Sequence, residues 1–398
     1  MYFGRLSVWR IRWIDRDGDN MDERDDINKY REREKRKKFA AKSAVFMVVI
    51  TVVILVAANW QTLVGPLKNV ALNIGAEGFP ITLPGSTKYD LGEMGDNLYL
   101  LTDTYLYTYT AAGGEIMSVQ HGFQNPACSG NSTRALVYDR NGRTFKFFSK
   151  SKEIYSIDTD DNIIFAGVGN NERTAVITSS TRYSNLMYIF NSEGRQIFRW
   201  ASPDEKIMGV CFGSDDNCIF VSVVGEKNGT LNSSVLRFDF NNAESETWRS
   251  PVGDDITYSL QNCFDGIYAV TESGSYLFDE KTGEIKASNS FNNELLGIPK
   301  SDTGIRTIIF RDSASNGAIA VSYNGKLEAV ASVKLGNVSA FDTNGGKLYV
   351  LSENHLNVYN SNLEGIKKYD LDDEYSDVKI LGNSAYLLRY NTVQRQVL

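Results

Sequence analysis

The sequence contains very little histidine: His121 and His355 are the only two in 398 residues. A histidine-rich metal site is therefore excluded, and a Ser-His-Asp arrangement would depend on one of these two side chains. The chain also lacks the G-x-S-x-G, H-E-x-x-H, P-loop and dinucleotide-binding patterns. We expect both histidines to be solvated or packed, and the sequence predicts no catalytic, cofactor-binding or metal-binding residue.

Positive charge is scarce in most of the chain. Residues 1–42 carry a net charge of +4, whereas all the residues after them carry a net charge of −11. A domain this acidic repels the phosphates of a nucleic acid instead of neutralising them. We therefore expect no nucleic-acid partner.

The chain has a single long hydrophobic run, the 22 uncharged residues 43–64. As a helix this run would be about 33 Å long, close to the thickness of a bilayer core of about 30 Å. Lys and Arg are dense just before it and sparse just after it, so the positive-inside rule places the N-terminus in the cytoplasm. A buried core helix is one alternative, although the run has no polar face. A signal peptide cleaved after Ala58 is another, although the leader is long for one.

These features predict four segments. They are a cytoplasmic tail at 1–42, a transmembrane signal-anchor helix at 43–64, a linker at 65–78 and an extracytoplasmic domain at 79–398. The predicted localisation is the cell membrane, crossed once, and the lipid bilayer is a predicted partner through this one helix.

Amphipathic helical segments are missing after residue 76, and short strand-like stretches such as "NLYLLTDTYLYTYT" and "GIYAVTESGSYLF" take their place. A similar turn follows each aromatic strand at intervals of about 40 residues, the length of one four-stranded propeller blade. The series begins with "AAGGEI" at Gly114 and ends with "NLEGIKK" at Gly365. The sequence therefore predicts an all-β fold, a β-propeller. A β-sandwich is the alternative, but it would not repeat one turn so regularly.

The two ends of this repeat are incomplete in complementary ways. The last unit stops after three strand segments, "SDVKILG", "SAYLLRY" and "TVQRQVL", whereas "FPITLPG" at 79–85 is one strand too many before the first complete unit. Pairing of Ile81 to Leu83 with Thr392 to Leu398 would close the ring and remove its exposed sheet edges. Pro80 and Pro84 suit an outermost edge strand. Seven complete units and one composite unit predict eight blades, with seven as the alternative.

The order of a basic leader, a single span, "GFPITLPG" and "GDNLYLLTDTYLYTYTAAGGEI" resembles an uncharacterised family, a domain of unknown function, of membrane-anchored proteins from anaerobic Gram-positive bacteria. The resemblance implies no activity and no catalytic residues. "FDEKTGEIKA" is also similar to the repeat of quinoprotein-type propellers in Asp279, Thr282 and Gly283, but Ala287 stands where that repeat has tryptophan. This partial match supports the fold and says little about a quinone cofactor.

The four cysteines, Cys128, Cys211, Cys218 and Cys263, all follow the predicted anchor. Cys211 and Cys218 flank the turn "FGSDDN", so a cross-strand disulfide is one alternative, whereas Cys128 and Cys263 occupy similar places in distant blades. Resemblance to proteins of anaerobes favours buried free thiols.

One acidic stretch, "DRDGDNMDERDD", spaces Asp15, Asp17, Asp19 and Asp26 as a calcium loop would. Asn20 stands where the sharp turn of such a loop needs glycine, so a solvated linker is the preferred interpretation.

Two classes of function remain. The first is a non-enzymatic binding or scaffolding module at the cell envelope, whose loops or central funnel bind a protein or an envelope polymer. The second is a propeller enzyme of the glycosidase, lyase or quinoprotein type. Glycoside cleavage needs two facing carboxylates, and the sequence singles out no pair. We favour the binding module; a deep pocket with paired carboxylates would favour the enzyme, and a shallow funnel of mixed polarity would favour binding.

Overall fold

The computed structural model describes residues 43, 46–51, 53, 78–83, 89–241, 245–301, 305–315 and 317–398. The chain divides into two units, Met1–Val70 and Ala71–Leu398. In the first unit the described residues, 43, 46–51 and 53, are helical. Among the described residues, no helix has both the length and the apolar character needed to cross a membrane. The rest of the predicted span at 43–64, the predicted tail and the calcium-like loop at 15–26 lie outside the described residues.

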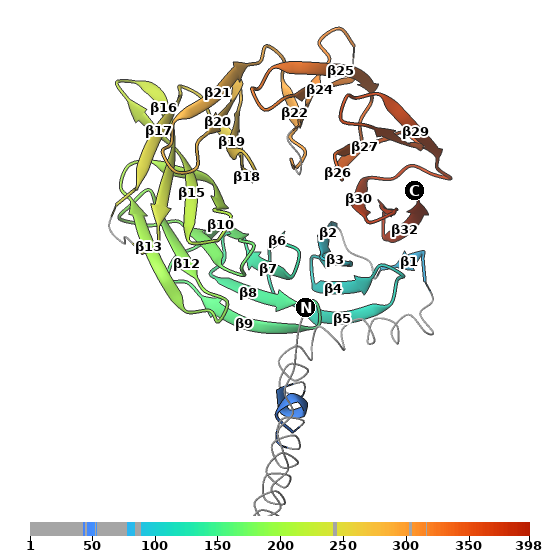
Figure 1. Cartoon of the computed structure of the whole chain (residues 1–398), viewed down its shortest axis with the longest axis horizontal. Helices are drawn as coiled ribbons and strands as arrows, with labels where there is room; N and C mark the ends of the chain where they lie inside the picture. The colour runs from blue at the N-terminus through green and yellow to red at the C-terminus, as the bar shows by residue number, and fades with distance from the viewer. Residues whose placement is uncertain are drawn as a thin grey trace, which may run out of the picture. The chain divides into compact units, whose positions relative to one another are not determined.

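The second unit is a ring of eight antiparallel sheets, each with four strands, as predicted (Figure 1). Each sheet is one blade, and in blades 1 to 7 the strands follow one another in chain order from the centre of the ring outwards. Blade 1 consists of β2 (Tyr89–Met94), β3 (Asn97–Thr102), β4 (Tyr105–Thr110) and β5 (Glu115–Gln120); blade 2 of β6 (Pro126–Gly130), β7 (Arg134–Asp139), β8 (Thr144–Ser149) and β9 (Lys152–Asp158). Blade 3 consists of β10 (Ile163–Val168), β11 (Thr174–Thr178), β12 (Asn185–Phe190) and β13 (Gln196–Ser202); blade 4 of β14 (Lys206–Phe212), β15 (Cys218–Lys227), β16 (Thr230–Asp239) and β17 (Trp248–Gly253).

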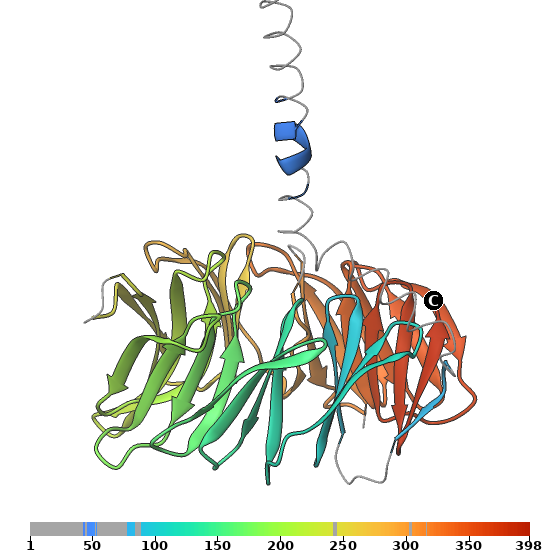
Figure 2. The same ribbon diagram turned by 90° about the horizontal axis from the view of Figure 1, so that it is seen from below.

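The later half of the ring repeats this pattern. Blade 5 consists of β18 (Thr257–Cys263), β19 (Gly266–Thr271), β20 (Gly274–Phe278) and β21 (Ile285–Ser290); blade 6 of β22 (Leu295–Gly297), β23 (Arg306–Arg311), β24 (Ala318–Tyr323) and β25 (Ala329–Gly336). Blade 7 consists of β26 (Ala340–Asn344), β27 (Lys347–Ser352), β28 (His355–Tyr359) and β29 (Gly365–Asp370); blade 8 of β30 (Asp377–Leu381), β31 (Ser384–Arg389), β32 (Thr392–Val397) and β1 (Ile81–Thr82). The view in Figure 2 shows the same blades from the side of the ring.

The ring is closed by pairing across the two ends of the propeller, as predicted. β1 is the outermost strand of blade 8, with Ile81 opposite Val393 and Thr82 opposite Thr392. The Leu83 N–H donates to the carbonyl of Asn391 at 2.7 Å, which extends the pairing by one residue. The Tyr386 hydroxyl of blade 8 donates to the carbonyl of Ala111 in blade 1 at 2.8 Å and ties the two neighbouring blades together.

The hydrophobic core lies between the blades and not in one central mass. The second strand of a blade is largely buried because it is covered on both faces by neighbouring blades; β3 and β19 are buried at every position. Outermost strands such as β21 instead alternate between exposed and half-buried residues. The closure between blades 8 and 1 has a core cluster of its own, which includes Leu91, Leu98 and Leu388.

The quinoprotein-like turn of blade 5 serves to join two blades. Asp279 accepts the backbone N–H groups of Lys281 and Thr282 at 2.9 and 3.0 Å, and this turn leads to Gly283 at φ +74°. The indole N–H of Trp248, in blade 4, donates to the carbonyl of Glu280 at 3.1 Å. A Cβ atom on Gly283 would lie 2.6 Å from the Trp248 ring. Glycine is therefore required here by both the left-handed backbone and the packed ring.

Candidate functional site in the central channel

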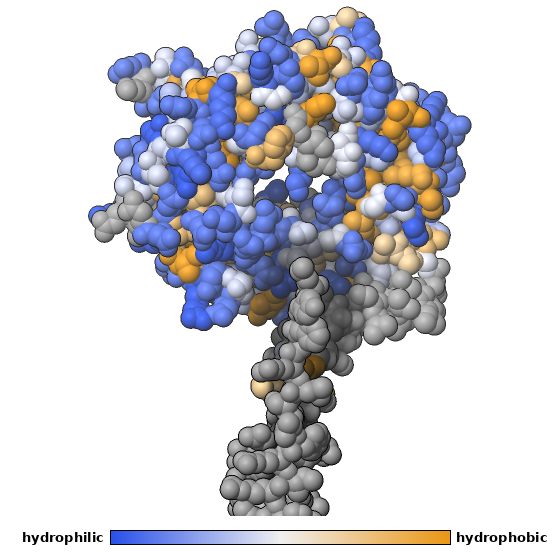
Figure 3. Space-filling view, in the orientation of Figure 1, coloured by the Kyte–Doolittle hydropathy of each residue, from blue (hydrophilic) through white to orange (hydrophobic). Residues whose placement is uncertain are grey.

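The innermost strands of the eight blades surround a channel, and the space-filling view keeps an opening at the centre of the ring (Figure 3). Each of these strands has one edge that no fifth strand covers, so its side chains stay partly accessible. All five residues of β26 are half-buried, and β30 alternates half-buried and buried residues. The half-buried residues of these two strands include Phe341 and Asp342 in β26 and Lys379 in β30, so this part of the channel wall is a surface of mixed polarity.

Three carboxylates lie on the wall where blades 7, 8 and 1 meet. We call Asp90, Asp342 and Asp377 the acidic group. Asp90 faces Leu101 and Asp377 faces Leu388, so the two aspartates hold equivalent positions in adjacent blades. Asp342 accepts the backbone N–H of Ile380 at 2.7 Å and lies 3.1 Å from the Lys379 ammonium. Lys379 thus pairs with Asp342 and lies close enough to Asp377 to influence its charge.

The surroundings of Asp377 perturb its titration. Burial, and to a smaller extent the charges of Asp90 and Asp342, raise the pKa of Asp377 from 3.8 to about 6, although the backbone N–H of Val378 and the charge of Lys379 act to lower it. A carboxyl that titrates near pH 6 beside a second carboxylate can exchange protons at physiological pH or attract a cation. Among the described residues, no group of three or more His, Cys, Asp or Glu side chains is arranged to hold a metal ion.

The structure shows where both histidines lie. His121, directly after β5, is buried: its Nε2–H donates to the Thr102 carbonyl at 3.1 Å, and its Nδ1 accepts the Phe123 N–H at 3.0 Å. Burial lowers the pKa of His121, so the ring stays neutral. Both ring nitrogens are hydrogen-bonded within the protein. His355 begins β28, with its Nδ1 3.0 Å from Asp370 on the neighbouring outer strand. His121 is therefore packed and His355 is half-buried, and neither lies in the acidic group.

All four cysteines are free thiols. Cys128 and Cys263 lie on the innermost strands of blades 2 and 5, Cys128 in the middle of its strand and Cys263 at the end of its strand, and Cys211 lies on the innermost strand of blade 4. Cys211 is opposite Phe220 and not Cys218, so the two residues that flank the turn are not cross-strand partners. Burial raises the pKa of each thiol, that of Cys218 to about 12, which disfavours the reactive thiolate.

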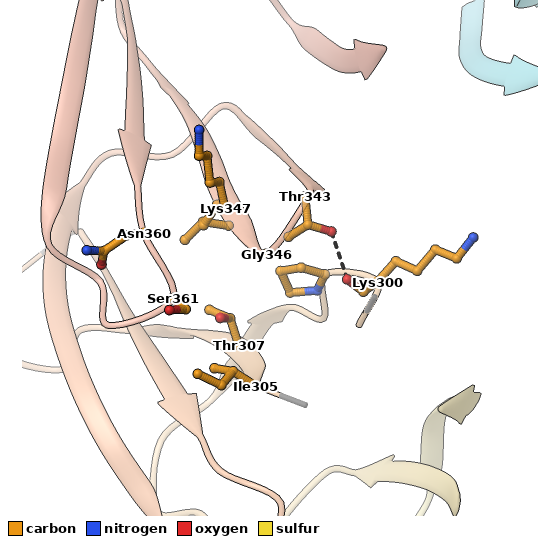
Figure 4. A pocket seen from close by; sticks show the side chains of 10 residues that line it. Lys300, Ile305, Thr307, Thr343, Gly346, Lys347, Asn360 and Ser361 are labelled. Atoms are coloured by element: carbon orange, nitrogen blue, oxygen red, sulfur yellow. Dashed lines mark hydrogen bonds between the residues drawn. The ribbon is translucent and has the colours of Figure 1, made fainter. Parts of the chain in front are cut away.

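A small cavity lies between blades 6 and 7 and is lined in part by Lys300, Thr307 and Thr343 (Figure 4). Its volume is about 20 Å³, room for about one water molecule. The Thr343 hydroxyl donates to the Lys300 carbonyl at 2.7 Å across its edge, and the ammonium groups of Lys300 and Lys347 point away from it. This cavity is too small for a sugar or an organic cofactor.

The sequence analysis missed the acidic group because its members come from three different repeat units, with Asp90 more than 250 residues before Asp342 and Asp377. The signal that could have found them is positional: Asp90 and Asp377 each occur near the start of the first strand of a repeat, five residues before the turn glycine. An alignment of the repeat units by their first strands, in place of their last turns, brings the two together.

Residues 81–397 match a family model described as "Family of unknown function (DUF5711)". No curated protein matches the sequence. Among solved structures, the chain is similar to BamB from Moraxella catarrhalis (11% identity, TM-score 0.53), over 78% of this chain and 96% of that one. It is also similar to the C-terminal WD40 domain of Sif2 (12%, TM-score 0.59), over 81% and 99% of the two chains. A third is Saccharomyces cerevisiae Sqt1 (9%, TM-score 0.59), again over 81% and 99%. At these identities the likeness shows the propeller fold alone.

Proposed function

Because the chain belongs to the family of unknown function that its residues 81–397 match, and has a propeller channel with a wall of mixed polarity, we propose that it is a membrane-anchored binding module for a protein of the cell envelope. The observation that carries this proposal is the acidic group: three carboxylates lie on a partly accessible wall, where Asp342 pairs with Lys379 and the charges of Asp90 and Asp342 raise the pKa of Asp377. Such a surface suits recognition of a charged group on a macromolecule.

A structural role does not explain the charge at Asp377. Its ionised form is disfavoured by burial and by two neighbouring carboxylates, so keeping an acid there costs stability at neutral pH. An asparagine could accept the same Val378 N–H bond without that cost. Groups that oppose stability in this way are characteristic of functional surfaces.

Anchoring in a membrane is supported by the first unit. The helical residues 46–51 and 53 expose apolar side chains, with Phe46 66% and Met47 68% exposed. Exposed side chains of this kind call for an apolar environment, and the run 43–64 that contains them is long enough to cross a bilayer. With the basic residues on its N-terminal side, the propeller would lie outside the cytoplasm. Protease added to wall-stripped cells should then remove the propeller and leave a short membrane fragment; protection of the propeller would refute this topology.

Co-purification tests the binding role. We expect a protein of the envelope to accompany the full chain at a fixed ratio in mild detergent, and to be recovered in a clearly reduced amount with Asp377→Asn. Asp370→Asn is the matched control because Asp370 lies on an outermost strand with its side chain 84% exposed. The absence of any protein at a fixed ratio, or equal retention by all three chains, would refute the proposal.

One observation favours a second candidate. A carboxyl with a raised pKa next to another carboxylate is also the arrangement of glycoside-cleaving enzymes, with Asp377 as the acid and Asp90 as its partner. Release of reducing ends from an envelope polysaccharide by the full chain, lost in Asp377→Asn, would establish it; no release would dismiss it.

A further inference from the structure

Four consecutive innermost strands share an irregularity that the other four lack. In blades 3, 4, 5 and 6 the register between the first two strands shifts by one residue, so that one residue bulges out of the ladder. The bulged residues are Ile164, Met208, Tyr258 and Leu296. In blades 1, 2, 7 and 8 the same pair of strands runs in unbroken register.

The four bulges lie at one end of the channel. Each falls at the second or third residue of its innermost strand. In blade 3 the residue after the bulge faces Ile177, and in blade 5 the residue after the bulge faces Val270. Ile177 and Val270 are each the last residue but one of the second strand. Asp90 and Asp377 face the same place in blades 1 and 8. The bulges and these two aspartates therefore occupy the same level, at the mouth where the innermost strands begin.

All four bulged side chains are apolar in character and accessible. Ile164 is 40% exposed, Met208 40%, Tyr258 58% and Leu296 41%. A bulge re-aims the extra side chain, and the exposed fractions show that all four side chains remain accessible at this mouth. Side chains of this size normally gain stability by burial. Their repetition in four adjacent blades makes an accessible apolar surface over half of the mouth, which we call the apolar arc.

The connections that reach this mouth are acidic. The chain passes from the outermost strand of one blade to the innermost strand of the next through "TDDN" at 159–162, "PDE" at 203–205, "DDI" at 254–256, "FNNE" at 291–294 and "LDDEYS" at 371–376. Seven of the eight connections of this kind contain no Lys or Arg, and the eighth, which joins β1 to β2 through residues 83–88, contains Lys88. Some of these acids are paired: Glu205 lies 2.8 Å from Arg249, Glu294 lies 2.8 Å from Arg311, and Asp373 pairs with Arg389. Other cations at this end are the two arginines of the adjoining "RNGR" turn at 140–143, Arg182 after β11 and Lys206 at the start of β14. The apolar arc is thus bordered mainly by carboxylates.

Blade 4 adds a projection beside the arc. The pairing of β14 with β15 ends at Lys206 and Val224. β15 and β16 continue beyond this point through three more pairs, the last of which is Lys227 with Thr230. This hairpin exposes Leu231 by 46%. An arm with an apolar side chain therefore extends the arc at the same end of the channel.

We propose that the apolar arc is the docking site for an extended segment of a partner protein, which places apolar side chains against blades 3 to 6 and a Lys or Arg side chain near Asp377 and Asp90. The inference rests on the proposed binding function and names the chemistry of the partner. A second copy of the acidic propeller would meet like charge at this mouth, and so would an anionic lipid surface. A cationic, apolar segment complements both halves of the mouth.

A library of random peptides displayed on phage tests the inference, with the full chain in detergent as bait. We expect enriched peptides to combine apolar residues with Lys or Arg, and the binding of a synthetic copy to weaken by about ten-fold or more in Tyr258→Asn. Phe264→Asn is the control, because Phe264 is an 81% exposed aromatic side chain just past the opposite end of the same strand, and should leave binding unchanged. Asp377→Asn should abolish the preference for cationic over neutral peptides while apolar binding persists.

Several results would overturn the inference. Equal binding by wild type and Tyr258→Asn, loss of binding in Phe264→Asn, or enrichment of acidic peptides would each contradict the arc as the docking site. Self-association of the full chain that disappears in Tyr258→Asn would assign the arc to a second copy instead. A library that yields no binder also refutes the inference, whereas the co-purified envelope protein decides the broader binding role separately.

Discussion

Replacement of Asp377 by asparagine should stabilise the protein at neutral pH, although it removes a charged group from the channel wall. The folded protein raises the pKa of this carboxyl from 3.8 to about 6, so the folded state holds the proton more tightly than the unfolded state. A shift of about two units corresponds to about 3 kcal/mol, which partial solvent screening reduces to about 2 kcal/mol. In the wild type the Val378 N–H donates to Asp377 Oδ1 at 2.8 Å. An asparagine side chain keeps an oxygen acceptor for this N–H and carries no charge.

The pH dependence gives this prediction its sign. Below about pH 4 the carboxyl is protonated in both states, and the wild type and the variant should be nearly equal in stability. As the pH rises through about 4 to 6 the wild type loses stability relative to the variant, and above about pH 6 the full difference remains. Asp90 and Asp342 raise the pKa and Lys379 lowers it, so a change at any of the three should alter the size of the effect.

Denaturant unfolding followed by tryptophan fluorescence, between about pH 4 and pH 7.5, measures this difference for the full chain. Asp370→Asn, on the outer surface, should change stability by less than about 0.5 kcal/mol at any pH in this range. A variant that is less stable than the wild type at pH 7.5, or a gain that stays constant down to pH 4, would refute the electrostatic account of the acidic group.

Three further changes test the fold. Deletion of residues 392–398 removes β32 and both edges that it pairs, and should lower the unfolding free energy of the whole ring by about 5 kcal/mol; an unchanged thermal midpoint would contradict closure through the termini. Gly283→Ala should cost about 3 kcal/mol through backbone strain and contact with Trp248, whereas Gly229→Ala, at φ +81° with open space around it, should cost about 1 kcal/mol; equal costs would mean that the ring contact does not matter. Asp265→Asn removes the ion partner of the buried Arg306 guanidinium and should cost about 3 kcal/mol in urea unfolding, and a neutral result would show that Arg306 needs no counter-charge.

The blade count and the closure could be predicted from the sequence because both depend on local patterns. Each outer turn lies in a fixed relation to its strands, and the surplus strand at Ile81 and the incomplete last unit are both visible as strings of letters. Edge placement of the first strand also followed from Pro80, which cannot donate to a sheet ladder. The structure confirms eight blades, with β1 outermost in blade 8.

The channel could not be predicted in the same way, because it is assembled from the starts of strands that lie about 40 residues apart. Ile163–Ile164, Ile207–Met208 and Leu295–Leu296 are adjacent apolar pairs that break strand alternation, and this is the signal of a bulge. A bulge, however, depends on the register of the partner strand, and that register cannot be determined from one stretch of sequence alone. The acidic group depends in addition on which blades become neighbours when the ring closes.

The most direct test of the account is a comparison of two photo-crosslinks formed in living cells. A photoreactive phenylalanine analogue at position 258 would sit in the apolar arc, and the same analogue at position 264 would sit just past the other end of β18. Both native residues are exposed aromatics, so neither replacement should disturb the fold. If the channel mouth is a binding site, position 258 should give one discrete protein adduct that position 264 does not, and Asp377→Asn should weaken it. The same adducts from both positions, or none from position 258, would contradict the claim that this mouth binds a protein.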